Sequence, residues 1–260
     1  MLKSEIVMGT SKFNSLHHKT APLLLGNVWC AKSAQAAEKA GFKALGTSSH
    51  AIAFSLGYAD GEQMPFEELL FVIKHIVKSV KIPVSVDLEA GYSADPKVVA
   101  NHVKQLAELG IEGINIEDGI VVDGKRKLAP TEELAKKIEA IKAKSDIFIN
   151  ARTDTFTTKH PNALKEAIER ANRYKEAGAD GIFVPLIETK NDLREFMKAV
   201  KLPLNVFTTP KLPEYDVLKD LGVSRISHGA KLYDQIQAKV EKKLSKFLKT
   251  KDYEVILGQK

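Results

Sequence analysis

Three acidic side chains near the ends of two predicted strands carry the strongest chemical signal in this 260-residue chain. Asp87 and Glu89 lie in the apolar run 83–90, and Glu117 lies in the run 113–118. Because side chains alternate along a strand, we expect Asp87 and Glu89 on one face. Three converging carboxylates repel one another, and a hard dication such as Mg²⁺ relieves that repulsion. The alternative, on the residues alone, is that these acids pair with Arg152 or accept hydrogen bonds from loops.

The elements that must position these acids are eight short apolar runs. They are 23–29, 44–49, 83–90, 113–118, 147–152, 181–186, 203–208 and 225–229. Several are rich in Val and Ile without polar alternation, which is typical of strands covered on both faces. Segments of helical period lie between them, and three end in a glycine that can close a helix. Eight strands alternating with helices predict a (β/α)₈ TIM barrel, whose active site lies at the C-terminal ends of the strands.

We predict one domain, with residues 1–20 as an N-terminal lead-in and 21–260 as a single barrel that includes a C-terminal helical segment. The one cysteine, Cys30, excludes an internal disulfide and a cysteine-rich zinc site, and it favours the cytoplasm. No apolar run is long enough to span a membrane, so we expect no membrane partner.

The formal net charge is +6, and much of the excess is spread over lysines of helical segments. The densest basic stretch, 239–251, falls on the predicted last helix. No basic strip is interleaved with aromatic residues, so we expect a solvated face and no nucleic-acid partner.

Seven stretches resemble the phosphoenolpyruvate mutase/isocitrate lyase superfamily and occur in the family order. They are 27–29, 41–49, 55–62, 83–92, 113–119, 150–154 and 177–181. The resemblance implies a (β/α)₈ barrel that exchanges its last helix between subunits, with dimers pairing into tetramers. It also implies Mg²⁺, a 2-oxo acid or its enolate, and the making or breaking of C–C or C–P bonds.

The resemblance implies roles for individual acids in metal binding. Asp87 matches the direct Mg²⁺ ligand. Asp60, Glu89 and Glu117 match acids that hold the water molecules of the metal.

Substrate contacts follow from the same resemblance. Arg152 matches the arginine that grips the anionic head of the substrate, and a guanidinium suits two-point recognition of a carboxylate. The other expected contacts come from a loop that holds the substrate carboxylate, an aromatic wall and the strand 203–208: Ser48, Ser49, His50, Trp29 and Asn205.

The segment 119–128 departs from the family pattern. It lacks the Lys-Lys-Cys-Gly-His motif of the lyases and the Lys-Thr-Asn-Ser stretch of the mutases. Cleavage of isocitrate or methylisocitrate is therefore not expected, and interconversion of phosphoenolpyruvate and phosphonopyruvate is not implied. Lys125 and Lys127 are candidates for groups that close over the substrate.

These observations predict a Mg²⁺-dependent enzyme that cleaves or rearranges a C–C or C–P bond of a small 2-oxo acid through an enolate. We expect Arg152 and Glu117 to act in catalysis, with His50 as an acid–base candidate. The alternative is a barrel that binds a 2-oxo acid without turnover, as a sensor or carrier.

Overall fold

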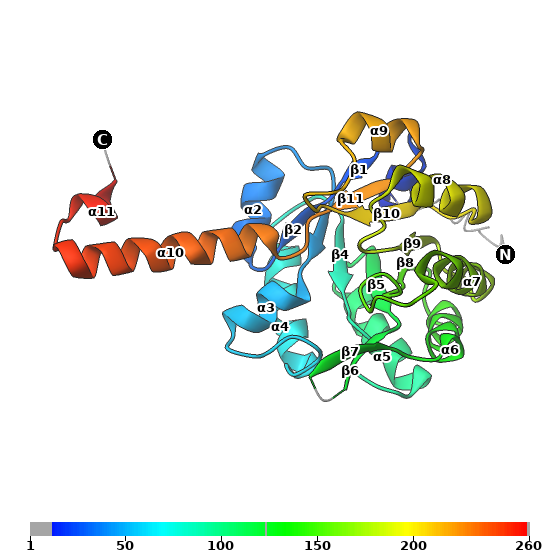
Figure 1. Cartoon of the computed structure of the whole chain (residues 1–260). Coiled ribbons are helices and arrows are strands. Elements are labelled where there is room, and N and C mark those ends of the chain that lie inside the picture. Colours follow the sequence, from blue (N-terminus) through cyan, green and yellow to red (C-terminus); the bar gives the residue numbers. More distant parts are fainter. Residues whose placement is uncertain (1–11, 123, 259–260) are drawn as a thin grey trace.

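The eight predicted runs form one parallel sheet that curls into a barrel surrounded by helices (Figure 1). The computed structural model describes residues 12–122 and 124–258. In chain order the strands are β1 (Leu23–Leu24), β2 (Gly26–Val28), β3 (Leu45–Thr47), β4 (Val84–Asp87), β5 (Gly113–Glu117), β8 (Phe148–Arg152), β9 (Gly181–Phe183), β10 (Leu204–Phe207) and β11 (Arg225–Ser227). The TIM-barrel prediction is confirmed.

The first predicted strand is divided at Leu25, and its two halves join opposite ends of the sheet. β1 pairs with β11 and β2 pairs with β3, both parallel. Leu25 N donates to Ile226 O at 2.9 Å, and Gly26 N donates to Ala44 O at 3.3 Å. This one segment therefore links the last strand to the second and closes the ring.

The segments of helical period between and after the predicted strands are helices in the structure. They are α2 (Ala31–Lys39), α4 (Phe66–Lys78), α5 (Pro96–Glu108), α6 (Thr131–Lys142), α7 (Ala163–Glu176), α8 (Lys190–Ala199) and α10 (Lys231–Thr250). Three short helices have no counterpart in the prediction: α3 (Ser49–Ser55), α9 (Tyr215–Asp220) and α11 (Glu254–Leu257). No helix in the ranges 12–122 and 124–258 is long and apolar enough to cross a membrane.

Alternation along the strands divides the interior into two regions. Ile114 and Ile116 of β5 face the helices and belong to the main apolar core. Asn115 faces the axis of the barrel, where its Oδ1 accepts hydrogen bonds from Asn150 Nδ2 and Arg225 Nη2, each at 2.9 Å. The apolar core therefore lies between sheet and helices, and a polar layer fills the barrel below the acids.

The described part of the lead-in packs against the starts of two strands. It forms α1 (Lys12–Ser15) and the 3₁₀ helix η1 (Leu16–His18), and residues 1–11 lie outside the described ranges. Phe13 is fully buried, and its ring meets Phe148, the first residue of β8, edge to face at 5.4 Å. Phe13 N donates to Glu112, which precedes β5. This segment thus covers the N-terminal end of the barrel, opposite the acids.

The last helix leaves the barrel instead of completing its ring. In Figure 1, α10 projects away from the body of the molecule and carries α11 at its far end. Along its length, large apolar side chains stay exposed at a spacing of four residues: Leu232, Ile236, Val240, Leu244 and Leu248.

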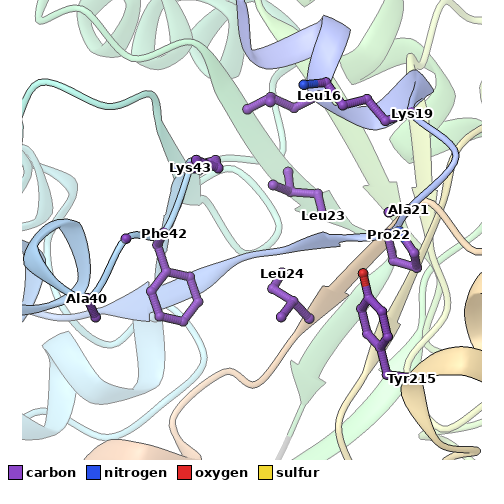
Figure 2. Close-up of a pocket in the computed structure, with 11 residues that line it drawn as sticks. Leu16, Lys19, Ala21, Pro22, Leu23, Leu24, Ala40, Phe42, Lys43 and Tyr215 are labelled. Atoms are coloured by element: carbon purple, nitrogen blue, oxygen red, sulfur yellow. The ribbon is translucent and has the colours of Figure 1, made fainter.

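A cavity of about 390 Å³ lies beside β1, lined by segments next to α2 and α9 (Figure 2). Leu24, Phe42 and Tyr215 provide much of its apolar lining, and Leu24 and Tyr215 are exposed. This cavity is an open groove between the end of α2 and the start of α9. It lies on the side of the barrel where an eighth helix would complete the ring.

Candidate active site at the C-terminal ends of the strands

Asp87 ends β4 and is held by two residues of the neighbouring strand and helix. Its backbone N–H donates to Thr47 Oγ1 at 3.0 Å. Its Oδ2 accepts from Ser49 Oγ at 2.8 Å and from Ser49 N at 3.4 Å. Among the described residues none donates a hydrogen bond to Oδ1, so this oxygen is available to a ligand in the pocket.

Glu89 is placed by a left-handed turn and not by strand alternation. β4 ends at Asp87, and Glu89 has a φ of 51°. Its Oε2 accepts from Glu62 N at 2.9 Å and its Oε1 from Tyr92 Oη at 3.2 Å. Burial, followed by the charges of Asp87, Asp60 and Glu62, raises the pKa of Glu89 to about 8. The expectation that a common strand face positions Asp87 and Glu89 is wrong, although both line one pocket.

Glu117 is enclosed by two arginines and shares them with Asp154. Arg152 Nη1 lies 2.8 Å from Glu117 Oε2, and Arg126 Nη1 donates to Glu117 Oε1. Burial raises the pKa of Glu117, against the opposing charge of Arg152 and Arg126. Although burial alone would raise it, the two guanidinium groups hold the pKa of Asp154 below its usual value.

Arg152 makes a two-point contact with Asp154. Its Nε donates to Asp154 Oδ1 at 2.8 Å and its Nη2 to Oδ2 at 3.1 Å. With the contact to Glu117, every nitrogen of this guanidinium already meets a carboxylate. Both terminal nitrogens keep a second N–H for a substrate, so the arrangement fits the expected role but also fits the pairing alternative.

Arg126 belongs to the site and was not predicted from the sequence. It lies on a hairpin of β6 (Gly119–Val122) and β7 (Lys125–Leu128), which pair antiparallel. Lys125 and Lys127 are exposed, whereas Arg126 is largely buried and contacts the acids. An Asp-Gly pair at 123–124, typical of tight hairpin turns, was the signal that could have placed Arg126 on the inner face.

His50 lies at the rim of the pocket. Its Nδ1 is 3.7 Å from Asp60 Oδ2, and its Nε2 is 3.8 Å from Asp234 Oδ1 in the first turn of α10. Its ring stacks on Phe54 at 4.2 Å. Ser48 N donates to Val28 O and Ser49 N donates to Asp87. The backbone N–H of His50, in the first turn of α3, has no acceptor among the described residues and is available to an anion.

Two adjoining cavities hold most of the predicted site residues. The charged one, about 260 Å³, is lined by all four proposed metal-site acids, both arginines and the loop: Asp60, Asp87, Glu89, Glu117, Arg126, Arg152, Ser48, Ser49 and His50. The second, about 190 Å³, shares Asp87 and Arg152 and is otherwise more apolar, with Phe183, Pro185, Leu186 and Phe207.

Two predicted substrate contacts do not line these cavities. The ring of Trp29 packs edge to face on Tyr233 of α10 at 5.3 Å, because the chain turns into α2 directly after β2. Asn205 is buried in the barrel, where its Nδ2 donates to Ser227 Oγ at 3.3 Å. Neither position brings the side chain to the pocket.

The acids fit a metal held largely through water. Among the described residues, no three His, Cys, Asp or Glu side chains converge as a ready cage of direct ligands. Carboxylates predominate among the possible metal ligands that line the pocket, and their mutual repulsion contributes, after burial, to the raised pKa of Glu89. An oxygen-rich set with few direct ligands suits Mg²⁺ better than Zn²⁺.

A parallel barrel whose acids and arginines gather at the C-terminal ends of its strands has the general form of a TIM-barrel enzyme. A family model described as phosphoenolpyruvate phosphomutase matches residues 13–248. An uncharacterized protein of Mycobacterium tuberculosis is 37% identical over 222 residues, covering 85% of this chain and 83% of the relative. The chain therefore belongs to the phosphoenolpyruvate phosphomutase family, within the superfamily that the sequence resembles.

Other relatives span several activities. A crystal structure provisionally assigned as a phosphonomutase from Burkholderia cenocepacia has a TM-score of 0.81 at 39% identity, covering 92% of this chain and 98% of that chain. The 2-methylisocitrate lyase of Bacillus subtilis is 31% identical over 197 residues, covering 72% of this chain and 64% of the relative. Phosphonopyruvate hydrolase, crystallised with oxalate and Mg²⁺, shares the fold with a TM-score of 0.82 at 23% identity, covering 93% of this chain and 87% of that chain. The relatives are thus enzymes acting on small acids, and they do not single out one reaction.

Proposed function

We propose that this protein is a Mg²⁺-dependent enzyme that cleaves or rearranges a C–C or C–P bond of a small 2-oxo acid through an enolate. The observation that supports this proposal most directly is the charged pocket, in which Asp87 presents a free oxygen beside Asp60, Glu89 and Glu117. A structural relative with oxalate and Mg²⁺, a planar mimic of an enolate and its metal, supports the choice of ligand.

Mg²⁺ would be held directly by Asp87, with Asp60, Glu89 and Glu117 accepting hydrogen bonds from its waters. When bound, the ion would stabilise negative charge on the oxygen of the oxo acid. Arg152 adds a fixed positive charge to the same cavity, and a charge that is already oriented stabilises a developing anion without reorganisation. The Ser49 hydroxyl donates its hydrogen to Asp87, so we assign the substrate carboxylate to the backbone N–H of His50, in the first turn of α3.

The hairpin offers no obvious proton donor to a leaving group. Over the range 119–128 the chain has neither Cys nor His. We therefore keep the prediction that isocitrate and methylisocitrate are not substrates, although some relatives are lyases of that kind. Decarboxylation or hydrolysis of a C–P bond needs no thiol from this hairpin, and both stay candidates. A barrel that binds the oxo acid without turnover is the alternative.

The test combines a turnover screen with one matched pair of variants. Substituted 2-oxo acids, including oxaloacetate and phosphonopyruvate, are assayed with and without Mg²⁺, and Mg²⁺ affinity is measured by calorimetry. We expect Asp87→Asn to abolish Mg²⁺ binding and turnover. Its free energy of unfolding should change by about 1 kcal/mol or less. The control, Asp146→Asn, replaces an exposed acid and should change neither Mg²⁺ affinity nor turnover. Unchanged Mg²⁺ affinity in Asp87→Asn would remove the metal site, and binding without turnover would favour the sensor or carrier.

We also propose that α10 packs on a second copy of the chain, in a dimer that pairs into a tetramer. Within the described part of the chain, nothing covers the apolar stripe of α10, and no helix covers the groove of about 390 Å³ beside Leu24 and Tyr215. Both surfaces are apolar and exposed, and every copy of the chain carries both. Exchange of α10 between two copies would bury both.

A further inference from the structure

Arg126 lies on the β6–β7 hairpin, and its guanidinium lies among the acids of the site. We infer that Arg126 is a positioning and specificity-determining residue that binds a second anionic group, on C3 of the 2-oxo acid. This inference rests on the proposed function and adds to it the residue that would hold the far anionic group of the substrate, a role that neither Lys125 nor Lys127 can take from its exposed position.

The guanidinium of Arg126 is anchored at one nitrogen and free at the other two. Nη1 lies 2.7 Å from Asp154 Oδ2 and also donates to Glu117. Nη2 approaches Asp60 Oδ2 only to 3.9 Å, beyond hydrogen-bond distance. Among the described residues Nε and Nη2 have no hydrogen-bond acceptor. Two adjacent N–H groups on one edge match the two oxygens of a carboxylate or phosphonate.

Arg126 differs in this respect from Arg152. All three nitrogens of Arg152 meet Asp154 or Glu117, whereas Arg126 is anchored through Nη1 alone. The side chain of Arg126 is 21% exposed, and it lines the same 260 Å³ cavity as Asp87 and Ser49. A cavity of that size accepts a small diacid beside a metal ion. Arg126 can therefore reach the far end of a substrate whose oxo-acid end lies at Asp87.

The hairpin is shaped around this arginine. Gly119 begins β6, and a Cβ on it would overlap Asp154 Oδ2 and Arg126 Nη1. A residue with a side chain at this position would push Arg126 away from its anchor. Since a guanidinium stays protonated throughout the physiological pH range, it can hold an anion here but cannot deliver a proton.

The test compares two ligands that differ at C3. Oxalate offers adjacent chelating oxygens and no group at C3. 3,3-Difluorooxaloacetate carries a second carboxylate there and has no proton on C3, so it cannot enolise. Affinities of both are measured by calorimetry at saturating Mg²⁺ for wild type, Arg126→Met, Arg126→Lys and Lys127→Met. Lys127 is the matched control, because it is an exposed cation one residue away on the same strand.

We expect Arg126→Met to weaken 3,3-difluorooxaloacetate about tenfold or more, the usual effect of losing a charge-assisted hydrogen bond. Oxalate affinity should stay within about twofold of wild type on the same reasoning. Arg126→Lys should retain part of the affinity, and Lys127→Met should retain all of it. Equal losses for both ligands in Arg126→Met would overturn the inference and leave Arg126 as a counter-ion for Glu117 and Asp154. Failure of wild type to bind oxalate with Mg²⁺ would instead overturn the proposed function, and this inference with it.

Discussion

Glu89 makes the stability of the metal-free protein depend on pH. Its folded pKa is about 8, against an ordinary value of 4.5. Between these values the folded state holds a proton that the unfolded state has lost, so the free energy of unfolding falls as pH rises. One proton contributes a slope of up to about 1.4 kcal/mol per pH unit. The contribution of Glu89 is thus complete below about pH 4.5 and lost above about pH 8.

Urea unfolding at several pH values in the presence of a chelator measures this slope. Glu89→Gln should reduce the slope by the share of Glu89, leaving the share of Glu117, and make the variant more stable than wild type at pH 8.5. Glu108→Gln, which changes an exposed acid of α5, should reproduce the wild-type curve. Saturating Mg²⁺ should also reduce the slope, because a dication favours the carboxylate form. A wild-type slope that persists in Glu89→Gln would assign the effect to another acid.

Arg152 gives a second prediction, because two roles are open to it. If it grips the substrate, Arg152→Lys keeps the charge and loses the planar fork, so a charge-assisted bond worth about 1.5–3 kcal/mol is lost. Catalytic efficiency should then fall roughly ten- to a hundred-fold or more, at about 1.4 kcal/mol per decade. Mg²⁺ affinity in the absence of substrate should barely change.

If Arg152 only neutralises Glu117 and Asp154, Arg152→Met should instead alter stability and metal affinity. Oxo-acid affinity would stay nearly the same. Calorimetry with the oxo acid at saturating Mg²⁺, on wild type and both variants, distinguishes the two roles. Equal affinities in all three would remove Arg152 from the substrate site.

The sequence could identify acids at strand ends, but not the contacts that orient them. Asp87 and Glu117 end strands whose apolar runs are visible in the sequence, so their convergence followed from the fold. Glu89 owes its position to a φ of 51° and to hydrogen bonds from Glu62 and Tyr92, which no local pattern encodes. The pairing of Arg126 with Asp154 joins residues 28 positions apart and depends on the hairpin.

Among the elements, long periodic segments were predictable and short ones were not. Helices such as α4 and α5 show a clear apolar stripe over thirteen residues each. The helix α3 has seven residues and begins inside a predicted strand end, at Ser49, so its period could not be recognised. The hairpin β6–β7 is not predicted from the sequence, because the charged residues of β7 hide its alternation.

The segment Lys12–His18 is an element whose contribution can be measured separately from the site. Phe13 is fully buried between His17 and Phe148 at the end of the barrel opposite the acids. Phe13→Ala should lower the free energy of unfolding by about 3–5 kcal/mol, as for other buried aromatic residues. Mg²⁺ affinity of the folded protein should not change.

Phe71→Ala provides the control, since Phe71 is 64% exposed on α4. Its effect on denaturant unfolding should be small. Comparable destabilisation by the two variants would show that α1 contributes little to the core.

For the molecule as a whole, α10 is the feature that a single chain leaves unexplained. Leu244 is 56% and Leu248 70% exposed on a twenty-residue helix that has its substantial contacts only with α11 among the described elements. A row of exposed leucines on one face commonly marks an interface. Asp234, in the first turn of α10, lies beside His50 at the rim of the site. Exchange of α10 would therefore connect assembly to the pocket.

The last prediction tests that exchange by reversing the polarity of the stripe. Leu244→Glu combined with Leu248→Glu should shift the oligomer towards monomer in light scattering, because a charge cannot be buried against the apolar groove without a large desolvation cost. Lys242→Glu is the control: it changes charge on the opposite face of α10 and should leave the mass unchanged. Leu24→Glu, in the groove, should have the same effect as the stripe variants, since both surfaces meet in one interface. Deletion of residues after Ala230 removes the stripe entirely and should give an aggregated or unfolded chain. If the full-length protein is monomeric at all concentrations tested, the proposal that α10 packs on a second copy of the chain is wrong.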